Sequence, residues 1–410
     1  YVTVSVENAL FPDEVSALND AYFYAGRETG SVDLSQIGHR SSPVTAIELN
    51  GQILYAVTGG GYEAIDREGR ILGRPTTSRA QLVVADISDP VNPVVIEKLF
   101  ANDIFPYHLN VNLPPDGFRD ITVVGQDMFL IGGNRLYHFD ITLPADPLLL
   151  DDISFATNDK VNGIVVRDEL IYVTGDFGLK IYRIQPDRTL IELQTVTVSD
   201  LGGVPTEVDI HADNLRVMIP MTSQIHELDL MVGDFAIVNT ISLRDLANNP
   251  VIPQGMLSHD DLLFVSTGQT GTVLLYAVQP DNSTPVVAQL SLAYLVQNGD
   301  LNAGDMMLYG QTLYVASGQG DVQLFDVAPW LDNRYRTTID LRHYFSVTGA
   351  VDAVAFGGDA IYAGTSFVYV DNEPTENPID VGASIGVVEI SYRLLNKYHY
   401  HEDIYQSIRL

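Results

Sequence analysis

The sequence predicts an all-β fold, a seven-bladed β-propeller made of four-stranded antiparallel blades. Three observations predict it. A short apolar run recurs seven times, each copy follows a run with apolar side chains at alternate positions, and most copies precede two further strand-like runs. A thin four-stranded sheet cannot bury both of its faces alone, so repeated sheets must stack on one another and close into a ring.

The apolar run is the clearest repeated element, and its reference residue is aromatic in all copies but one. The reference residues are Tyr55, Phe129, Tyr172, Arg216, Phe264, Tyr314 and Tyr362. From Phe129 onward they are separated by 43, 44, 48, 50 and 48 residues, whereas the first step spans 74 residues. Given a usual blade length of about 45 residues, the first repeat is expected to hold an insertion of roughly 28 residues.

A strand is expected before each reference run, because apolar residues stand eight and six positions upstream, with Ser258 as the one polar exception. These pairs are Ile47/Leu49, Ile121/Val123, Ile164/Val166, Val208/Ile210, Met256/Ser258, Met306/Leu308 and Val354/Phe356. Alternation with a period of two indicates a strand that buries one face. Polar turns such as Asn50-Gly51 separate the two runs, so each pair is expected to form a hairpin.

The third and fourth strands are clearest in "LVVADISDPVNPVVIEKL", residues 82–99. Pro90 and Pro93 lie between two apolar runs there, and proline favours a turn because it fixes φ and cannot donate to a central sheet ladder. The last repeat lacks a clear fourth strand. The run "YVTVSV", residues 1–6, is expected to complete it and close the ring, and the C-terminal residues 393–410 are the alternative.

The same stretch also resembles the LVIVD repeat of bacterial and archaeal exported propellers, and the matching residues are Leu82, Val83, Val84, Asp86, Ile87, Ser88, Asp89, Pro90 and Pro93. The match is clear in this repeat and reduced elsewhere to the strand and its aspartate. The resemblance implies an exported propeller and brings no catalytic residues. The expected organisation is an N-terminal strand and irregular extension (residues 1–43), the propeller (residues 44–391) and a C-terminal tail (residues 392–410).

Composition narrows the function. The chain has 410 residues and a net charge of −31, so nucleic acid is a poor partner for it. It has no cysteine, which excludes a thiol nucleophile and a cysteine-ligated zinc site. No apolar run of about 18 residues is present, so membrane insertion is not expected. The charge, the first residue Tyr1 and the resemblance all favour an extracellular or cell-surface location.

The first candidate site is an acidic mouth of the central channel. Its residues are Asp120, Glu207, Asp305 and Asp352. They stand beside the core pairs of the first strands, which converge on the axis of a propeller. Clustered carboxylates would bind a hard cation such as Ca²⁺ or have raised pKa values. The alternative is an ordinary solvated channel lining.

Two further metal candidates lie near the C-terminus. The loop "DNEPTENPID" offers Asp371, Asn372, Glu373, Glu376 and Asp380, a density of oxygen ligands that suits Ca²⁺ without matching an EF-hand. His399 and His401 alternate, so they would share one face of a strand and could bind a transition metal. A solvated loop and a polar tail are the alternatives. No cofactor is expected to be required.

The expected function is a non-enzymatic extracellular interaction or structural module. Its contacts with a protein partner or a neighbouring subunit would lie on the long loops of the first and last blades. The interface candidates in irregular segments are Tyr107, Tyr369, Tyr398 and Tyr400. No catalytic residue can be assigned, because the sequence has no G-x-S-x-G elbow or phosphate loop. The alternative is a hydrolase or lyase acting on polysaccharide, with its site at the acidic channel mouth.

Overall fold

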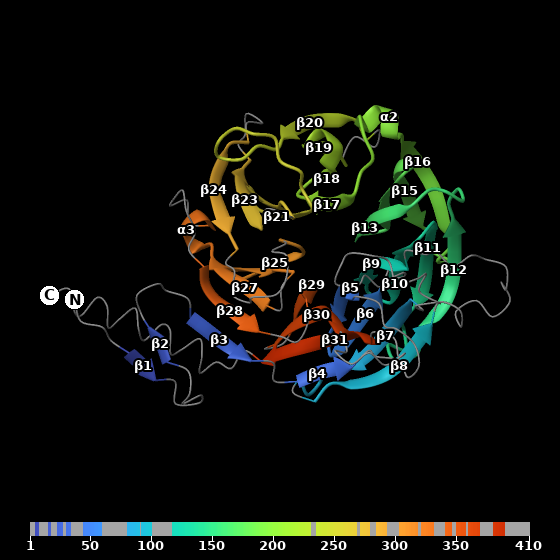
Figure 1. Cartoon of the computed structure of the whole chain (residues 1–410). Helices are drawn as coiled ribbons and strands as arrows, with labels where there is room; N and C mark the ends of the chain where they lie inside the picture. Colours follow the sequence, from blue (N-terminus) through green and yellow to red (C-terminus); the bar gives the residue numbers. More distant parts are fainter. Residues whose placement is uncertain are drawn as a thin grey trace, which may run out of the picture.

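The computed structural model is a ring of twisted, mainly antiparallel sheets whose first strands lie nearest the axis of the ring (Figure 1). The described residues are 5–7, 15–17, 23–27, 30–33, 44–59, 80–90, 92–100, 117–230, 235–268, 271–278, 284–292, 303–318, 321–331, 341–346, 350–357, 360–369 and 380–389. None of the helices in these ranges is long and apolar enough to cross a membrane.

Five sheets follow one another from the N-terminal side of the ring, each with four antiparallel strands in chain order. Sheet one holds β5 (Val44–Asn50), β6 (Ile53–Thr58), β7 (Gln81–Asp86) and β8 (Val94–Phe100). Sheet two holds β9 (Phe118–Val124), β10 (Asp127–Gly132), β11 (Arg135–Asp140) and β12 (Leu148–Ser154). Sheet three holds β13 (Val161–Arg167), β14 (Leu170–Gly175), β15 (Gly178–Ile184) and β16 (Leu190–Val196).

The next two sheets repeat this order. Sheet four holds β17 (Glu207–His211), β18 (Asn214–Ile219), β19 (Gln224–Asp229) and β20 (Ile237–Ser242). Sheet five holds β21 (Gly255–His259), β22 (Leu262–Ser266), β23 (Thr272–Ala277) and β24 (Val286–Ser291). The short helices α2 (Val198–Leu201), η1 (Pro220–Thr222) and α3 (Ala328–Leu331) occupy connections between strands.

The remaining two sheets each take a strand from the N-terminal region. Sheet six orders β25 (Met306–Tyr309), β26 (Thr312–Ala316), β27 (Asp321–Asp326), β28 (Leu341–Ser346) and β3 (Phe23–Arg27), with β3 parallel to β28. The last sheet orders β29 (Ala350–Gly357), β30 (Ala360–Tyr369), β31 (Asp380–Glu389) and β4 (Gly30–Asp33). Among the described residues, therefore, six sheets of the ring are four-stranded and antiparallel, against the seven such blades that the sequence predicts, because sheet six takes β3 as a fifth strand.

The strand that completes the last sheet is not the predicted one. β4 pairs antiparallel with β31, with Ser384 opposite Asp33 and Val387 opposite Gly30. β1 (Ser5–Glu7), inside the predicted run 1–6, pairs instead with β2 (Val15–Ala17) in a separate two-stranded sheet. The physical reason is chain path, because β4 lies shortly before β5 and reaches the neighbouring last sheet directly. β3 and β4 thus both pair with sheets of the ring, and residues 392–410 lie outside the described ranges.

The hydrophobic core lies between adjacent sheets rather than in a single centre. Tyr55 and Leu82 of sheet one pack with Phe118 and Tyr137 of sheet two, and equivalent clusters join each later pair. A further cluster joins the last sheet to sheet one and closes the ring. The aromatic reference residues are buried in these layers. Each sheet therefore depends on its neighbours to cover its apolar faces.

The first strands make a closed cycle around the channel. β5, β9, β13, β17, β21, β25 and β29 each contact the next, and β29 contacts β5 (Figure 1). Residues on the channel side of these strands are consequently brought together from distant parts of the chain.

Candidate functional site

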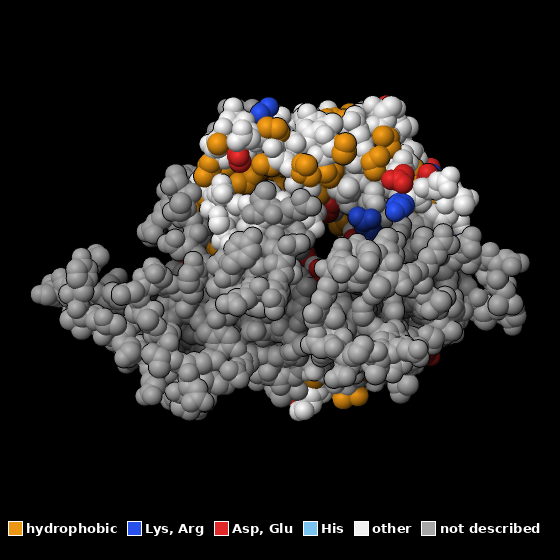
Figure 2. All heavy atoms as spheres, in the orientation of Figure 1, with side chains coloured by type: hydrophobic (Ala, Val, Ile, Leu, Met, Phe, Trp, Pro, Cys, Tyr) orange, Lys and Arg blue, Asp and Glu red, His pale blue; other side chains and the backbone are white. Residues whose placement is uncertain are grey.

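Carboxylates from several first strands converge in the central channel, as the sequence predicted for three of the four named acids. Asp120 on β9, Glu207 on β17 and Asp305 directly before β25 interact electrostatically with one another. Asp352 lies on β29 with an exposed side chain. Figure 2 shows acidic side chains in the wall of the central hollow.

Each of the three converging carboxylates also bonds to the next sheet of the ring. Ile164 N donates to Asp120 Oδ2 (3.2 Å), Met256 N donates to Glu207 Oε2 (2.9 Å), and Val354 N donates to Asp305 Oδ2 (3.0 Å). The other oxygen of Asp120 and of Asp305 accepts the backbone N–H of the following residue. These acids therefore join neighbouring first strands through charge-assisted hydrogen bonds.

Small residues alternate with the acids around the ring. The corresponding residues of successive sheets are Ala46, Asp120, Gly163, Glu207, Gly255, Asp305 and Ala353. A Cβ on Gly163 would lie 3.2 Å from Glu207 Cα, and one on Gly255 would lie 2.9 Å from Ser266 Oγ and 3.8 Å from Glu207 Oε2. A side chain at Gly163 would therefore be tight against the backbone of sheet four, and one at Gly255 would be tight against Ser266 of its own sheet.

Burial and mutual repulsion raise the pKa values of this cluster. Burial is the main cause for Asp120 and Asp305, and it raises the pKa of each to about 6 despite the backbone N–H groups that favour the charged forms. Asp305 keeps accessible surface toward the channel, but protein surrounds it, so desolvation prevails. The pKa of Glu207 is raised well above its usual value by burial and then by Asp305.

Glu48 on β5 belongs to the same cluster, and the sequence analysis did not identify it. Burial, followed by the charges of Asp120 and Asp305, raises the pKa of Glu48 to about 7. The available signal was its position, two residues after Ala46 and therefore on the same side of the first strand. Asp209, two residues after Glu207, holds the corresponding place in sheet four and accepts the N–H of Ser258 at 3.1 Å.

The predicted metal sites receive no geometric support within the ranges that the structure describes. In those ranges, no three acidic or histidine side chains are grouped so that they could hold a metal ion. Of the predicted calcium loop, Asp371, Asn372, Glu373 and Glu376 lie outside the described residues, and Asp380 begins β31. His399 and His401 also lie outside them.

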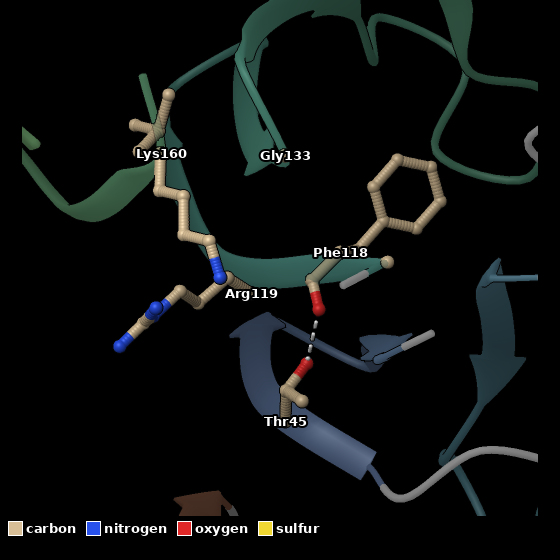
Figure 3. Close-up of a pocket in the computed structure, with 7 residues that line it drawn as sticks. Thr45, Phe118, Arg119, Gly133 and Lys160 are labelled. Atoms are coloured by element: carbon tan, nitrogen blue, oxygen red, sulfur yellow. Dashed lines mark hydrogen bonds between the residues drawn. The ribbon is translucent and has the colours of Figure 1, made fainter. Parts of the chain in front are cut away.

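A small pocket lies where sheets one, two and three meet at the start of their first strands. Its volume is about 200 Å³, and its lining residues are Thr45, Gly117, Phe118, Arg119, Gly133, Lys160 and Val161. Arg119 and Lys160 contribute its two cationic side chains, and Thr45 Oγ1 donates to the Phe118 carbonyl at 3.0 Å (Figure 3). Sequence reasoning missed this pair, because the two cations stand 41 positions apart in a strongly acidic chain.

Outer strands of four consecutive sheets expose apolar side chains. These residues are Val94 and Ile96 on β8, Leu148 and Leu150 on β12, Ile191 and Leu193 on β16, and Ile237 and Val238 on β20. In the described part of the chain, no further strand pairs with the outer edge of any of these strands. Such an edge offers unpaired backbone groups to an added strand.

Of the predicted interface tyrosines, only one falls in a described element. Tyr369 is the last residue of β30, opposite Asp380 of β31. Tyr107, Tyr398 and Tyr400 lie outside the described residues.

Known structures share this arrangement of sheets. A Lactobacillus plantarum protein superposes with a TM-score of 0.55 at 14% identity, over 73% of this chain and 87% of its own. Saccharomyces cerevisiae Sqt1 superposes with a TM-score of 0.53 at 11% identity, over 89% and 99%. The fold is a β-propeller. A Bacteroides fragilis protein described as a candidate 6-phosphogluconolactonase gives a TM-score of 0.52 at 10% identity, over 73% and 86%.

At these identities the likeness of the propeller to solved structures concerns the fold alone. No protein-family model matches the sequence, and no curated protein matches it. The function must therefore be argued from the residues of this propeller.

Proposed function

We propose that this propeller is a non-enzymatic interaction module that binds an extended segment of a protein partner along the outer strands of its sheets. The observation that supports this proposal is the pairing of β3 with β28. A short segment from a distant part of the chain adds in parallel to an outer strand, with His343 opposite Phe23 and Ser346 opposite Arg27. An outer edge of this propeller therefore accepts an added strand. In this proposal the five-stranded sheet six counts as a blade alongside the six four-stranded ones, so the propeller has seven blades.

The exposed outer strands β8, β12, β16 and β20 have the side chains that such a partner would need. Val94 is 61% exposed and Leu148 is 64% exposed, and each is followed two positions later by a second exposed apolar residue. Residues two apart on a strand share one face. Strand addition would supply backbone hydrogen bonds, and these apolar pairs would select the partner's side chains.

Charge favours a basic partner. The net charge of −31 produces a negative field that speeds the approach of positively charged segments and repels acidic ones. The proposed partner segment is therefore extended, with alternating apolar and basic residues.

Four further parts of the proposal are supported by the sequence alone: the loop contacts, the exported location, the repeat family and Ca²⁺ binding. The long loops of the first and last blades are proposed as a second contact surface, with self-assembly as one use of it. An exported location and membership of the LVIVD repeat family are proposed from the motif and the charge. Ca²⁺ binding by the loop at residues 371–380 is likewise a proposal, and its test is whether EDTA changes the melting temperature.

One observation favours the enzymatic alternative, a polysaccharide hydrolase or lyase. Glu48 has a pKa of about 7, which suits a general acid or base, and other carboxylates surround it. Asp120, Glu207 and Asp305, however, use their oxygens to accept backbone N–H groups of adjacent strands. A structural role for these three explains their geometry more directly. Measurable polysaccharide cleavage that Glu48→Gln abolishes would establish the alternative.

The proposed function is tested with fluorescent ten-residue peptides in which apolar residues alternate with lysine. Fluorescence anisotropy should show binding of these peptides, and peptides of the same composition with apolar and basic residues in separate blocks should bind at least about tenfold more weakly. Leu148→Lys with Leu150→Lys on β12 should lower the number of peptides bound per chain. Leu143→Lys, at an exposed turn, is the control. Equal binding of alternating and blocked peptides would contradict strand addition.

A further inference from the structure

We propose that the outer edges of sheets one to four form a continuous track for one extended partner segment, which passes from sheet to sheet around the rim of the ring. This inference rests on the proposed function, strand addition to an outer edge, and it specifies the partner as a chain with successive short segments of apolar and basic residues. The observation that carries it is the placement of β3 and β4, which lie at the outer sides of two adjacent sheets.

β3 and β4 show that one short stretch of chain can pair with two neighbouring sheets. β3 lies beside β28 in sheet six, with Ser346 opposite Arg27, and β4 lies beside β31 in the last sheet, with Val387 opposite Gly30. Arg27 and Gly30 are three peptide steps apart in the sequence, so their Cα atoms are separated by at most about 11 Å. The outer sides of these two sheets are therefore close enough for one continuous extended chain.

The outer strands of the ring share one direction, so the same path exists at other sheets. β3 is parallel to β28, the fourth strand of its sheet, and β4 is antiparallel to β31, the third strand of its sheet. Both therefore run in the direction of a fourth strand. β8, β12, β16 and β20 are fourth strands too, and they follow one another around the rim (Figure 1). By the same path, a segment parallel to β8 would end where a segment parallel to β12 could begin.

The exposed apolar side chains continue through four adjacent sheets rather than being scattered over the ring. They are Val94 and Ile96 on β8, Leu148 and Leu150 on β12, Ile191 and Leu193 on β16, and Ile237 and Val238 on β20. The series stops at the next outer strand, β24, where Val286 and Val287 are half-buried. Continuity over neighbouring sheets favours one long ligand over four separate short ones.

Charge indicates the composition of the partner. β8, β12 and β16 each carry an acid beside their exposed apolar residues, namely Glu97, Asp151 and Glu192. The net charge of −31 adds a negative field over the whole chain. β3, the strand that the chain itself adds to an outer edge, ends with the basic residue Arg27. The partner should therefore mix apolar and basic residues in segments that match the outer strands in length, joined by about two residues as β3 and β4 are.

A partner that occupies two edges gains affinity through effective concentration. Once its first segment is paired, a short connection holds the second segment beside the next edge, and linkage of this kind raises affinity by about 10²–10⁴-fold. The gain disappears when the connection cannot span the distance between the two edges. The length of the connection therefore tests whether the edges are continuous.

The test is fluorescence anisotropy of the whole chain with labelled synthetic peptides. The single peptide is one segment of alternating leucine and lysine with the seven-residue length of β8 and β12, and the double peptide is two such segments joined by Gly-Ser. The control peptide has the composition of the double peptide, but leucine and lysine form separate blocks in its second segment. The double peptide should bind at least about a hundredfold more tightly than the control, and about half as many double as single peptides should bind per chain.

Two variants with the same added charge distinguish adjacent edges from alternate ones. In each variant lysine replaces four exposed apolar residues and two of the four edges remain. The adjacent-edge variant keeps β8 and β12 and should retain the gain of the double peptide; its changes are Ile191→Lys, Leu193→Lys, Ile237→Lys and Val238→Lys. The alternate-edge variant keeps β12 and β20 and should lose that gain while it still binds the single peptide; its changes are Val94→Lys, Ile96→Lys, Ile191→Lys and Leu193→Lys. Circular dichroism checks that both are folded, and the peptide comparison on the unaltered chain does not depend on them.

The outcomes separate the track from strand addition itself. If the single peptide binds but the double and control peptides bind equally, the track is overturned and strand addition stands. A gain that appears only when a Gly/Ser linker of about twelve residues joins the two segments would also overturn the track, because the edges would then be separate sites. No binding of either the single or the double peptide would contradict strand addition, and the track with it.

Discussion

Arg216 occupies the position on β18 where the other six sheets of the ring have a buried aromatic residue, and it is itself 0% exposed. Its charge is compensated locally. Arg216 Nε donates to Glu227 Oε1 at 2.9 Å and Nη1 donates to Ser258 Oγ at 2.8 Å, while Asn239 Nδ2 donates to Glu227 Oε2 at 2.8 Å. Between sheets four and five, a network of polar side chains therefore takes the place of a buried aromatic side chain.

Removing one partner of this network should be far more damaging than removing both charges. Glu227→Leu leaves a buried, uncompensated guanidinium, and we expect it to lower the free energy of unfolding by about 3–5 kcal/mol. The double variant Arg216→Met/Glu227→Leu should recover most of that loss, since it returns the site to the apolar pattern of the other sheets. Thermal and urea denaturation measure both. Equal losses in the single and double variants would show that packing, rather than charge, decides stability here.

Glu48 makes stability depend on pH near neutrality. Burial holds the pKa of Glu48 at about 7 in the folded chain, against a usual value of 4.5. The folded state therefore binds more protons than the unfolded state between these values, so stability should fall as the pH rises from about 4.5 to about 7 and then level off. Glu48→Gln removes this titration. At pH 8 it should raise the free energy of unfolding by on the order of 2 kcal/mol, allowing for the partial contact of Glu48 with water.

The measurement is the melting temperature from pH 5 to 8, in which Glu48→Gln should flatten the decline that the original chain shows below about pH 7. Glu169→Gln, an exposed residue in a hairpin turn, should leave the slope unchanged. A slope that is the same with and without Glu48 would assign the titration to Asp120, Glu207 and Asp305 instead.

For individual residues, the sequence predicted where a side chain lies in the fold better than it predicted which residues that side chain contacts. Arg216 interrupts an aromatic series and is visible in the sequence, but its partner Glu227 lies on the next strand, where only the pairing register decides which residue it meets. Asp120, Glu207 and Asp305 could be placed at the channel because the repeat aligns them. Their bonds to the next sheet could not be predicted, because these depend on the spacing between sheets.

At the scale of strands, the carboxylate bonds should hold the first strands together around the channel. Asp305→Ala removes the acceptor of both Met306 N–H and Val354 N–H. Each donor left without a partner costs about 1–3 kcal/mol, so we expect a loss of about 2–4 kcal/mol after relief of the repulsion that Asp305 exerts on Glu48 and Glu207.

Hydrogen exchange gives the local measurement for this variant. The amides of Met306 and Val354 should exchange faster, while those at the centre of β14, far from the change, should not. Asp213→Ala removes an exposed acid with the same charge and serves as the control. Unchanged protection at Val354 in Asp305→Ala would show that the carboxylate bond contributes nothing to the contact between sheet six and the last sheet.

The sequence predicted which segments form strands, but it did not predict which strands pair at the edges of the last two sheets. The hairpin of the first two strands and the third strand follow an alternation that local sequence shows, and the structure confirms them in all the repeats. β4 has four residues, Gly30 to Asp33, and β3 has five, Phe23 to Arg27, so neither presents a recognisable pattern. Their pairing is decided by where the chain passes, a property of the whole fold.

The whole molecule is closed by its own N-terminal region, which supplies the last strand of one sheet and an additional strand to its neighbour. β3 covers the outer edge of β28, and β4 completes the sheet of β31. The two segments therefore do different things: β3 protects an edge from pairing with other chains, and β4 contributes to ring closure. Truncations that remove them one at a time should separate these effects.

Deletion of residues 1–29 removes β3 and keeps β4, so it should uncover the edge of β28 and cause association that increases with concentration. Sedimentation velocity should show larger species than the complete chain forms at the same concentration. A peptide of residues 20–29, "DAYFYAGRET", should reverse that association when added in excess, because it restores the missing strand.

Deletion of residues 1–19, which removes β1 and β2 alone, is the control, and this variant should sediment like the chain of residues 1–410. Deletion of residues 1–33 also removes β4 and should lower the melting temperature further, since the last sheet loses its outer strand beside the ring closure. If the chain without residues 1–29 sediments like the complete chain and does not bind the peptide, then β3 does not protect the edge of β28, and the pairing that supports strand addition as the function of this propeller loses its force.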